Sequence, residues 1–234
     1  MSTDVLRGLD PFDLFDAEAA RLDAFFSGLT GAGWDRPSRC DGWSVRDVLA
    51  HLAGEELYNH ACLDDDLDGL YALMEKEGVH DLADFNEWCV RTRRDLPVAD
   101  VLAEWRRKNG DTRRRMRELG PDGSLTTMAG PYPAGLQTLH YASEFATHGD
   151  DIGVPVTAGE EPARTDRRAR IAIFALDERD SPLHVEEIHG GFLVRLDGLA
   201  ADLSPADFVD ATVSRLPPDH SLDSALRAEL AVLA

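Results

Sequence analysis

The chain has 234 residues, of which 43% are hydrophobic, so it can bury a sizeable core as one large domain or as one domain with a small annex. Its 44 acidic and 24 basic residues give a formal net charge of −20. This charge argues against a nucleic acid partner and against docking on anionic lipid, because both need a basic face.

Targeting and redox features are sparse. The N-terminal stretch MSTDVLRGLDPFDLFD has no basic segment followed by an apolar run, and no stretch reaches the roughly 18 apolar residues of a membrane span. Cys40, Cys62 and Cys89 form no CxxC pair, so we expect neither a disulfide framework nor a thiolate zinc site. A cytoplasmic protein fits these features best.

Helical periodicity predicts the first elements of the chain. Residues 11–30 carry apolar side chains at helical spacing, which indicates an amphipathic helix. A glycine-rich loop follows, and Ser44 then begins a second helix, because Ser44 and Asp47 form a capping-box pattern. This second helix runs to about Leu63, where the acidic stretch DDDLD ends it.

Two further long helices follow a shorter one predicted over residues 81–94. Pro97 suits the first position of the third long helix, which Gly120 and Pro121 end. The turn-rich segment MAGPYPAG is expected to be a loop, and the fourth long helix covers about residues 135–152. Four long amphipathic helices predict a four-helix bundle over residues 1–155.

The chain changes character after Val154. Residues 155–168 are typical of a linker, and residues 170–177 could be strand or helix. Residues 183–198 alternate apolar and polar side chains around two glycines, which predicts a hairpin, and two short helices follow it. We therefore expect a mainly α protein, in which the bundle is followed by a small α+β region over residues 156–234.

The predicted fourth helix carries His140, Glu144 and His148 at intervals of four residues. Neighbours in this stripe lie about 6 Å apart along the helix axis, and the two histidines about 12 Å apart, too far for one ion with bonds of about 2 Å. One neighbouring pair could share a metal ion with a ligand from another helix. The second helix offers His51, which is paired with Glu55 at the same spacing.

Two imidazoles and a carboxylate would leave coordination positions open, as catalytic metal sites do. Such donors suit zinc, and also iron, nickel or cobalt. The same spacing also occurs where a core histidine is simply hydrogen-bonded or where a Glu–His pair lies on a helix surface.

Two motifs resemble the mycothiol-dependent maleylpyruvate isomerase family, which belongs to the DinB-like metal-binding four-helix bundles. The first motif is SRCDGWSVRDVLAHLAGEE at residues 38–56. The second has the pattern E-x-x-x-H-x-x-D-I and is formed by Glu144, His148, Asp151 and Ile152. The segment NEWCVRTRRDLPVADVLAEW between them is also similar, so the resemblance covers about residues 10–155.

The resemblance implies that His51, Glu144 and His148 hold a divalent metal, with Zn²⁺ the first candidate. It also implies that mycothiol is the thiol cosubstrate, whose thiolate adds to a small-molecule electrophile in an S-transferase or an isomerase reaction. Glu55 and Asp151 are candidates for orienting the histidines. Asn86 lies in a helix that relatives use near the pocket, and His140 lies one turn from Glu144, where it would line the pocket or be satisfied in the core. Both are candidates for contacting the substrate or cosubstrate.

Two other functions remain open on the sequence. The bundle could be a metal-dependent hydrolase with water at the open position. It could also be a non-catalytic ligand-binding module that kept the fold without the metal. The sequence fits a monomer or a homodimer, and we expect residues 156–234 to cap the substrate pocket.

Overall fold

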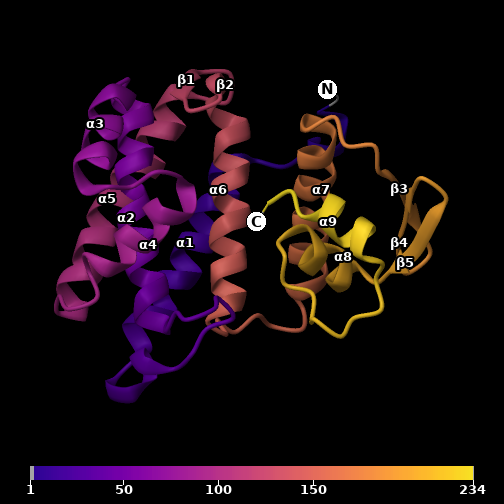
Figure 1. Cartoon of the computed structure of the whole chain (residues 1–234), viewed down its shortest axis with the longest axis horizontal. Helices are drawn as coiled ribbons and strands as arrows, with labels where there is room; N and C mark the ends of the chain where they lie inside the picture. Colours follow the sequence, from indigo (N-terminus) through magenta and orange to yellow (C-terminus); the bar gives the residue numbers. More distant parts are fainter. Residues whose placement is uncertain (1–2, 234) are drawn as a thin grey trace. The chain divides into compact units, whose positions relative to one another are not determined.

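The computed structural model describes residues 3–233, which divide into two compact units (Figure 1). One unit is Asp10–Val154, and the other combines residues 3–9 with residues 155–233. The expected fold class is confirmed, because the first unit is a helical bundle and the second is a small α+β unit.

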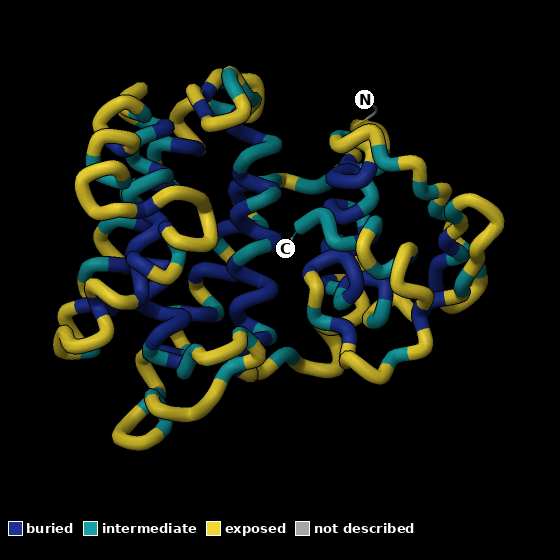
Figure 2. The backbone as a smooth tube through the Cα atoms, viewed as in Figure 1, coloured by how far each residue is buried: buried dark blue, intermediate teal, exposed yellow. Residues whose placement is uncertain are grey.

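Four long helices form the bundle: α1 (Pro11–Gly28), α2 (Val45–Asp64), α5 (Val98–Leu119) and α6 (Ala134–Asp151). Helix α1 packs mainly against α6, and α2 packs mainly against α5. Aromatic side chains fill the space between the pairs, and Phe15, Phe145 and Trp105 are each at most 2% exposed. Burying each such side chain contributes roughly 1.5–3 kcal/mol to folding. In Figure 2, dark blue marks the buried residues, and much of it lies along the helices of the bundle.

Two shorter helices, α3 (Leu67–Glu77) and α4 (Leu82–Arg91), pack beside α2. Helix α4 was predicted, whereas α3 was not. The acidic stretch after α2 does end that helix, because Asp65 adopts a left-handed backbone conformation with φ of 56°. Its neighbour Asp66 then caps α3 by accepting a hydrogen bond from the N–H of Gly69. The same acidic residues therefore end one helix and begin another.

The segment between α5 and α6 is a short hairpin, where a loop was expected. Strands β1 (Ser124–Thr127) and β2 (Gly130–Pro133) pair antiparallel, and β2 leads directly into α6. Two short 3₁₀ helices, η1 (Asp4–Leu6) and η2 (Gly31–Asp35), lie before α1 and before α2.

Besides η1, the described residues of the second unit form a three-stranded antiparallel sheet and three α-helices. Its elements are α7 (Glu161–Glu178), β3 (His184–Ile188), β4 (Gly191–Leu196), β5 (Leu199–Leu203), α8 (Pro205–Thr212) and α9 (Ser224–Leu230). The sheet order is β3-β4-β5, so the predicted hairpin is confirmed. Residues 3–9 belong here because the Arg170 side chain donates hydrogen bonds to the carbonyl oxygens of Val5 and Arg7.

The predicted linker over residues 155–168 is wrong from Glu161 onward, where α7 begins. Residues 170–177, which the sequence left between strand and helix, are also helical. The arginines Arg164 and Arg168 are buried on α7, so the segment does not show the usual apolar stripe of a buried helix face. Among residues 3–233, no helix is both long enough and apolar enough to cross a membrane.

The N-terminus of α2 is held by the predicted capping box. Ser44 and Asp47 exchange side-chain to backbone hydrogen bonds, and the Asp47 Oδ1 atom also accepts one from Arg94 Nε at 2.9 Å. Burial raises the pKa of Asp47, but the hydrogen bonds from Ser44 and Arg94 outweigh it and hold the pKa below its usual value. This network fixes the start of the helix that carries His51.

We expect Asp47→Asn to lower the free energy of unfolding of the bundle by about 1 kcal/mol at neutral pH, since it weakens a cap and removes the charge opposite Arg94. A carboxyl group with a lowered pKa in the folded state stabilises the fold above its unfolded pKa of about 3.9, and this contribution is lost as the pH falls. Urea denaturation of both proteins between about pH 7 and pH 3 should therefore show the difference shrinking on acidification. A difference that is constant over this range would contradict the assignment.

Helix α4 approaches α2 closely at Gly54. A Cβ atom at this position would lie 2.3 Å from Cys89 Cβ and 2.6 Å from Cys89 Sγ. We expect Gly54→Ala to destabilise the bundle by about 1–3 kcal/mol through overpacking. Gly110 on α5 has no atom within 4 Å of an added Cβ, so Gly110→Ala should be neutral or stabilising by up to about 1 kcal/mol. Equal effects of the two substitutions in denaturant melts would show that the close contact is unimportant.

Candidate metal centre

Helices α2 and α6 bring together the three residues that the sequence singled out. The Nε2 atom of His51 lies 3.3 Å from Oε1 of Glu144, and the rings of His51 and His148 have centroids 4.8 Å apart. Each residue offers one potential ligand atom, and the three atoms all lie within 4.8 Å of one another. The helical spacing of four residues places Glu144 and His148 on one side of α6, facing His51.

The site is enclosed on one side and open at Glu144. The side chains of His51 and His148 are 3% and 11% exposed, whereas the Glu144 side chain is 36% exposed. The Trp43 ring covers His51, with ring centroids 5.2 Å apart. Of the three side chains, Glu144 is therefore the one in substantial contact with solvent.

Glu55 lies next to the same imidazole nitrogen. Its Oε2 atom is 3.4 Å from His51 Nε2, and its buried Oε1 atom has no hydrogen-bond partner within residues 3–233. Burial and the charge of Glu144 raise the pKa of Glu55 well above its usual value. Desolvation acts in the same direction on Glu144, but the hydrogen bonds with His51 and Glu55 outweigh it and lower the pKa of Glu144. The pKa values of the two neighbouring carboxyl groups therefore shift in opposite directions, and burial favours the neutral form of Glu55.

The two histidines differ in their surroundings. Burial lowers the pKa of His51, and the neighbouring Glu144 only partly offsets this. Burial also acts to lower the pKa of His148, but its contacts with Asp151 and Cys40, and the charge of Glu144, raise it to about 9. The Nδ1 atom of His148 lies 3.2 Å from Asp151 Oδ2, so Asp151 accepts its hydrogen and fixes the orientation of the ring.

The loop before α2 is attached to the last turn of α6. The N–H of Arg39 donates to the carbonyl of Asp151 at 2.9 Å, and Arg36 Nη2 donates to the carbonyl of Ile152 at 3.2 Å. The Cys40 thiol also donates to Asp151 Oδ2, with a Sγ to Oδ2 distance of 3.1 Å. The beginning of the first sequence motif therefore contacts the end of the second.

Sequence reasoning missed Cys40 as a member of this cluster. Its partner Asp151 is 111 residues away in the chain, and no local spacing connects them. The only available signal was that both residues belong to the two motifs that carry the family resemblance.

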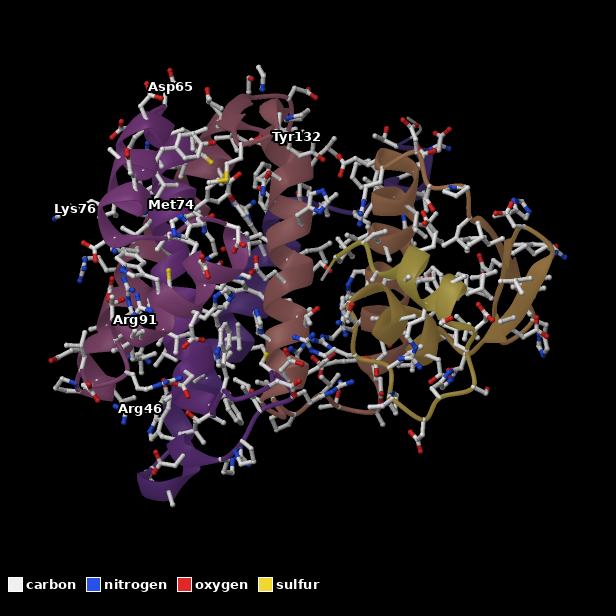
Figure 3. All side chains as sticks on the ribbon, in the orientation of Figure 1. Arg46, Asp65, Met74, Lys76, Arg91 and Tyr132 are labelled. Atoms are coloured by element: carbon white, nitrogen blue, oxygen red, sulfur yellow. The ribbon has the colours of Figure 1, made fainter. Side chains whose placement is uncertain are left out.

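The structure does not bring the other two candidates into the group of His51, Glu144 and His148. His140 Nε2 lies 3.2 Å from the hydroxyl of Tyr132, which Figure 3 labels near the start of α6. Asn86 is half-buried on α4, the helix that packs against α2. Contacts of Asn86 and His140 with substrate or cosubstrate stay predictions.

Comparison with known proteins gives one family match and similar solved structures. The family model described as "Mycothiol maleylpyruvate isomerase N-terminal domain" matches residues 15–153. A crystal structure of a mycothiol-dependent maleylpyruvate isomerase is similar with a TM-score of 0.62 and 14% identity, covering 92% of both chains. The crystal structure of a histidine-to-alanine mutant of such an isomerase has a TM-score of 0.61 and 14% identity over 88% of both chains. At this identity the likeness establishes the fold. No curated sequence matches the chain.

The clustering of the three side chains leads to a prediction about metal content. We expect His51→Ala and Glu144→Gln each to lose about one equivalent of bound zinc relative to the wild type, since a site with three protein ligands does not tolerate the loss of one. Elemental analysis after dialysis with zinc measures this. His60→Ala is the matched control, because His60 is also on α2 but faces the Lys108 carbonyl, 3.3 Å from its Nε2 atom. Unchanged zinc content in the first two variants would show that the cluster holds no metal.

Proposed function

Because the chain belongs to the mycothiol maleylpyruvate isomerase N-terminal domain family, whose model matches residues 15–153, we propose that it is a metal-dependent enzyme that uses mycothiol as thiol cosubstrate. The expectation of an enzyme agrees with the isomerase family to which the chain belongs. The observation that carries the proposal is the convergence of His51, Glu144 and His148 in one half-open site. Both motifs that contain these residues lie inside the matched region.

The donor set fits a divalent cation. Two carboxylates, Glu55 and Glu144, lie 3.4 Å and 3.3 Å from the same nitrogen of His51 in a site that is largely shielded from water. Burying such groups without compensating charge costs several kcal/mol per ion, which favours either a retained proton or a bound cation. Imidazole and carboxylate donors are the usual ligands of zinc, and we propose Zn²⁺ as the resident ion.

His51, Glu144 and His148 would hold the ion, with Asp151 supporting His148 through its Nδ1 atom. Glu55 lies beside the same His51 nitrogen as Glu144, so it would add negative charge next to the ion and would not orient the His51 ring. When bound, the cation supplies a Lewis acid that favours the thiolate form of a thiol at neutral pH. Asp151 keeps the proton of His148 on Nδ1, which leaves Nε2 as the nitrogen available for the ion. Glu144 lies at the exposed side, so a cosubstrate would approach past it.

The proposed reaction is addition of the mycothiol thiolate to an electrophilic carbon of a small unsaturated molecule. If the new C–S bond breaks again after rotation about the adjacent single bond, the thiol is regenerated and the product is the trans isomer. If the bond remains, the product is a thioether and one thiol is consumed per turnover. The two proposed activities, isomerase and S-transferase, therefore differ in the fate of the thiol.

A turnover assay that follows both the electrophile and the free thiol tests the proposal. With maleylpyruvate and a panel of related cis-enones, we expect conversion that requires both mycothiol and zinc. His51→Ala and Glu144→Gln should lower the rate at least about 100-fold, whereas His60→Ala should leave it unchanged. Constant thiol concentration during conversion identifies an isomerase, and stoichiometric loss identifies a transferase.

Two results would contradict this function. Conversion that is independent of thiol would favour a hydrolase that uses water in place of mycothiol. A zinc-loaded protein that converts no electrophile of the panel but binds one of them in calorimetry would favour a non-catalytic binding module.

A further inference from the structure

A second cluster of donor atoms lies beside the proposed zinc ligands. Cys40 Sγ is 3.1 Å from Asp151 Oδ2 and 3.8 Å from His148 Nδ1, and that Nδ1 atom is 3.2 Å from the same oxygen. These three atoms belong to three different types of metal ligand: a thiol, an imidazole and a carboxylate. Like the atoms of the first group, these three atoms come from residues far apart in the chain that the packing of the bundle brings together.

The separations match those between ligands of one small cation. With bonds of about 2.3 Å to sulfur and about 2.0–2.2 Å to nitrogen and oxygen, two ligands at the tetrahedral angle lie roughly 3.3–3.6 Å apart. All three observed distances agree with these values to within roughly half an ångström. Little movement of the side chains is therefore needed to admit an ion.

We propose that Cys40, His148 and Asp151 form a second cation site, which takes a thiophilic divalent ion such as Zn²⁺ or Cd²⁺ and shares the His148 imidazole with the first site. His148 can serve both sites because its ring has two nitrogens, and Nδ1 is the one that faces Cys40 and Asp151. Without the second ion, the thiol proton and the Nδ1 proton occupy this position, and both are released when the ion binds. The first site, and the proposed function with it, does not depend on the second.

The backbone around Cys40 holds the thiol in place. The N–H of Cys40 donates to Ser38 Oγ at 3.1 Å, and the adjacent Arg39 N–H donates to the Asp151 carbonyl at 2.9 Å. The ligand loop is thus fixed to α6 before any ion binds, which lowers the cost of organising a site.

Exposure and donor type determine which ions can enter. Cys40 is half-buried, whereas Cys62 and Cys89 are 2% and 0% exposed, so Cys40 is the accessible thiol within residues 3–233. A thiolate selects zinc, cadmium and similar soft ions over Mg²⁺ and Ca²⁺, which prefer oxygen ligands. The site should therefore discriminate by ion chemistry, as the first site does not contain sulfur.

Cadmium titration of the full chain, after removal of metal with a chelator, tests the proposal. A thiolate–cadmium bond produces an ultraviolet charge-transfer band, which reports on Cys40 without reference to activity. We expect the wild type to bind about two equivalents of cadmium, with the band growing for one of them. Cys40→Ser keeps a hydrogen-bond donor beside Asp151, so it should fold normally, bind one equivalent fewer and show no band.

Two further variants serve as controls. Cys62→Ser removes a buried thiol and should behave as the wild type. His51→Ala removes the first site and should keep the charge-transfer band, because the second site does not use His51.

The other outcomes overturn the proposal in distinguishable ways. One equivalent without a thiolate band shows that Cys40 is only a hydrogen-bond donor, and it leaves the first site and the proposed function intact. One equivalent with a band that disappears in His51→Ala shows a single ion bound across both groups. No bound cadmium in the wild type overturns the second site and the proposed zinc site together.

Discussion

The attachment of the loop before α2 to the last turn of α6 is the constraint on which the site depends. The Arg39 N–H to Asp151 carbonyl hydrogen bond, 2.9 Å long, joins two segments more than 100 residues apart, and the Cys40 thiol bonds to the side chain of the same aspartate. Asp151 in turn orients His148. Helix α2 begins five residues after Cys40, so this attachment also limits where His51 can lie. One aspartate therefore links the position of both histidines.

Electrostatics explains why these ionisable residues are stable only as a group. The interior of the bundle at this point contains two imidazoles and the carboxyl groups of Glu55 and Glu144, with only Glu144 substantially exposed. Charged groups that are removed from water are stable only when they are paired, protonated or bound to a cation. Without a metal ion, a proton can compensate the buried charge, because the pKa of Glu55 is raised while the pKa of Glu144 is lowered. A divalent ion would compensate the same buried charge in place of a proton. The proposed metal chemistry is therefore assigned to this cluster.

Helix α4 packs closely against α2 next to the residues of this cluster. Gly54 lies between His51 and Glu55, and its missing side chain lets Cys89 approach to a distance that no Cβ would allow. Tight packing of this kind transmits small displacements, because protein interiors have few voids to absorb them. Helix α4 therefore packs directly against the turn of α2 that carries the two residues facing the site.

The sequence by itself determined the four long helices, the capping box at Ser44 and the neighbouring pair Glu144 and His148, because each follows from local periodicity or from the needs of a helix end. It did not reveal α3 or the first half of α7. The acidic residues before α3 act both as an end and as a cap, and α7 buries arginines where a core helix usually places apolar side chains. Only the tertiary structure decided that His51 meets Glu144 across 93 residues of chain, and that Cys40 meets Asp151 across 111. The backbone of one helix sets spacing along its own axis, whereas contacts between segments this far apart depend on how the whole bundle packs.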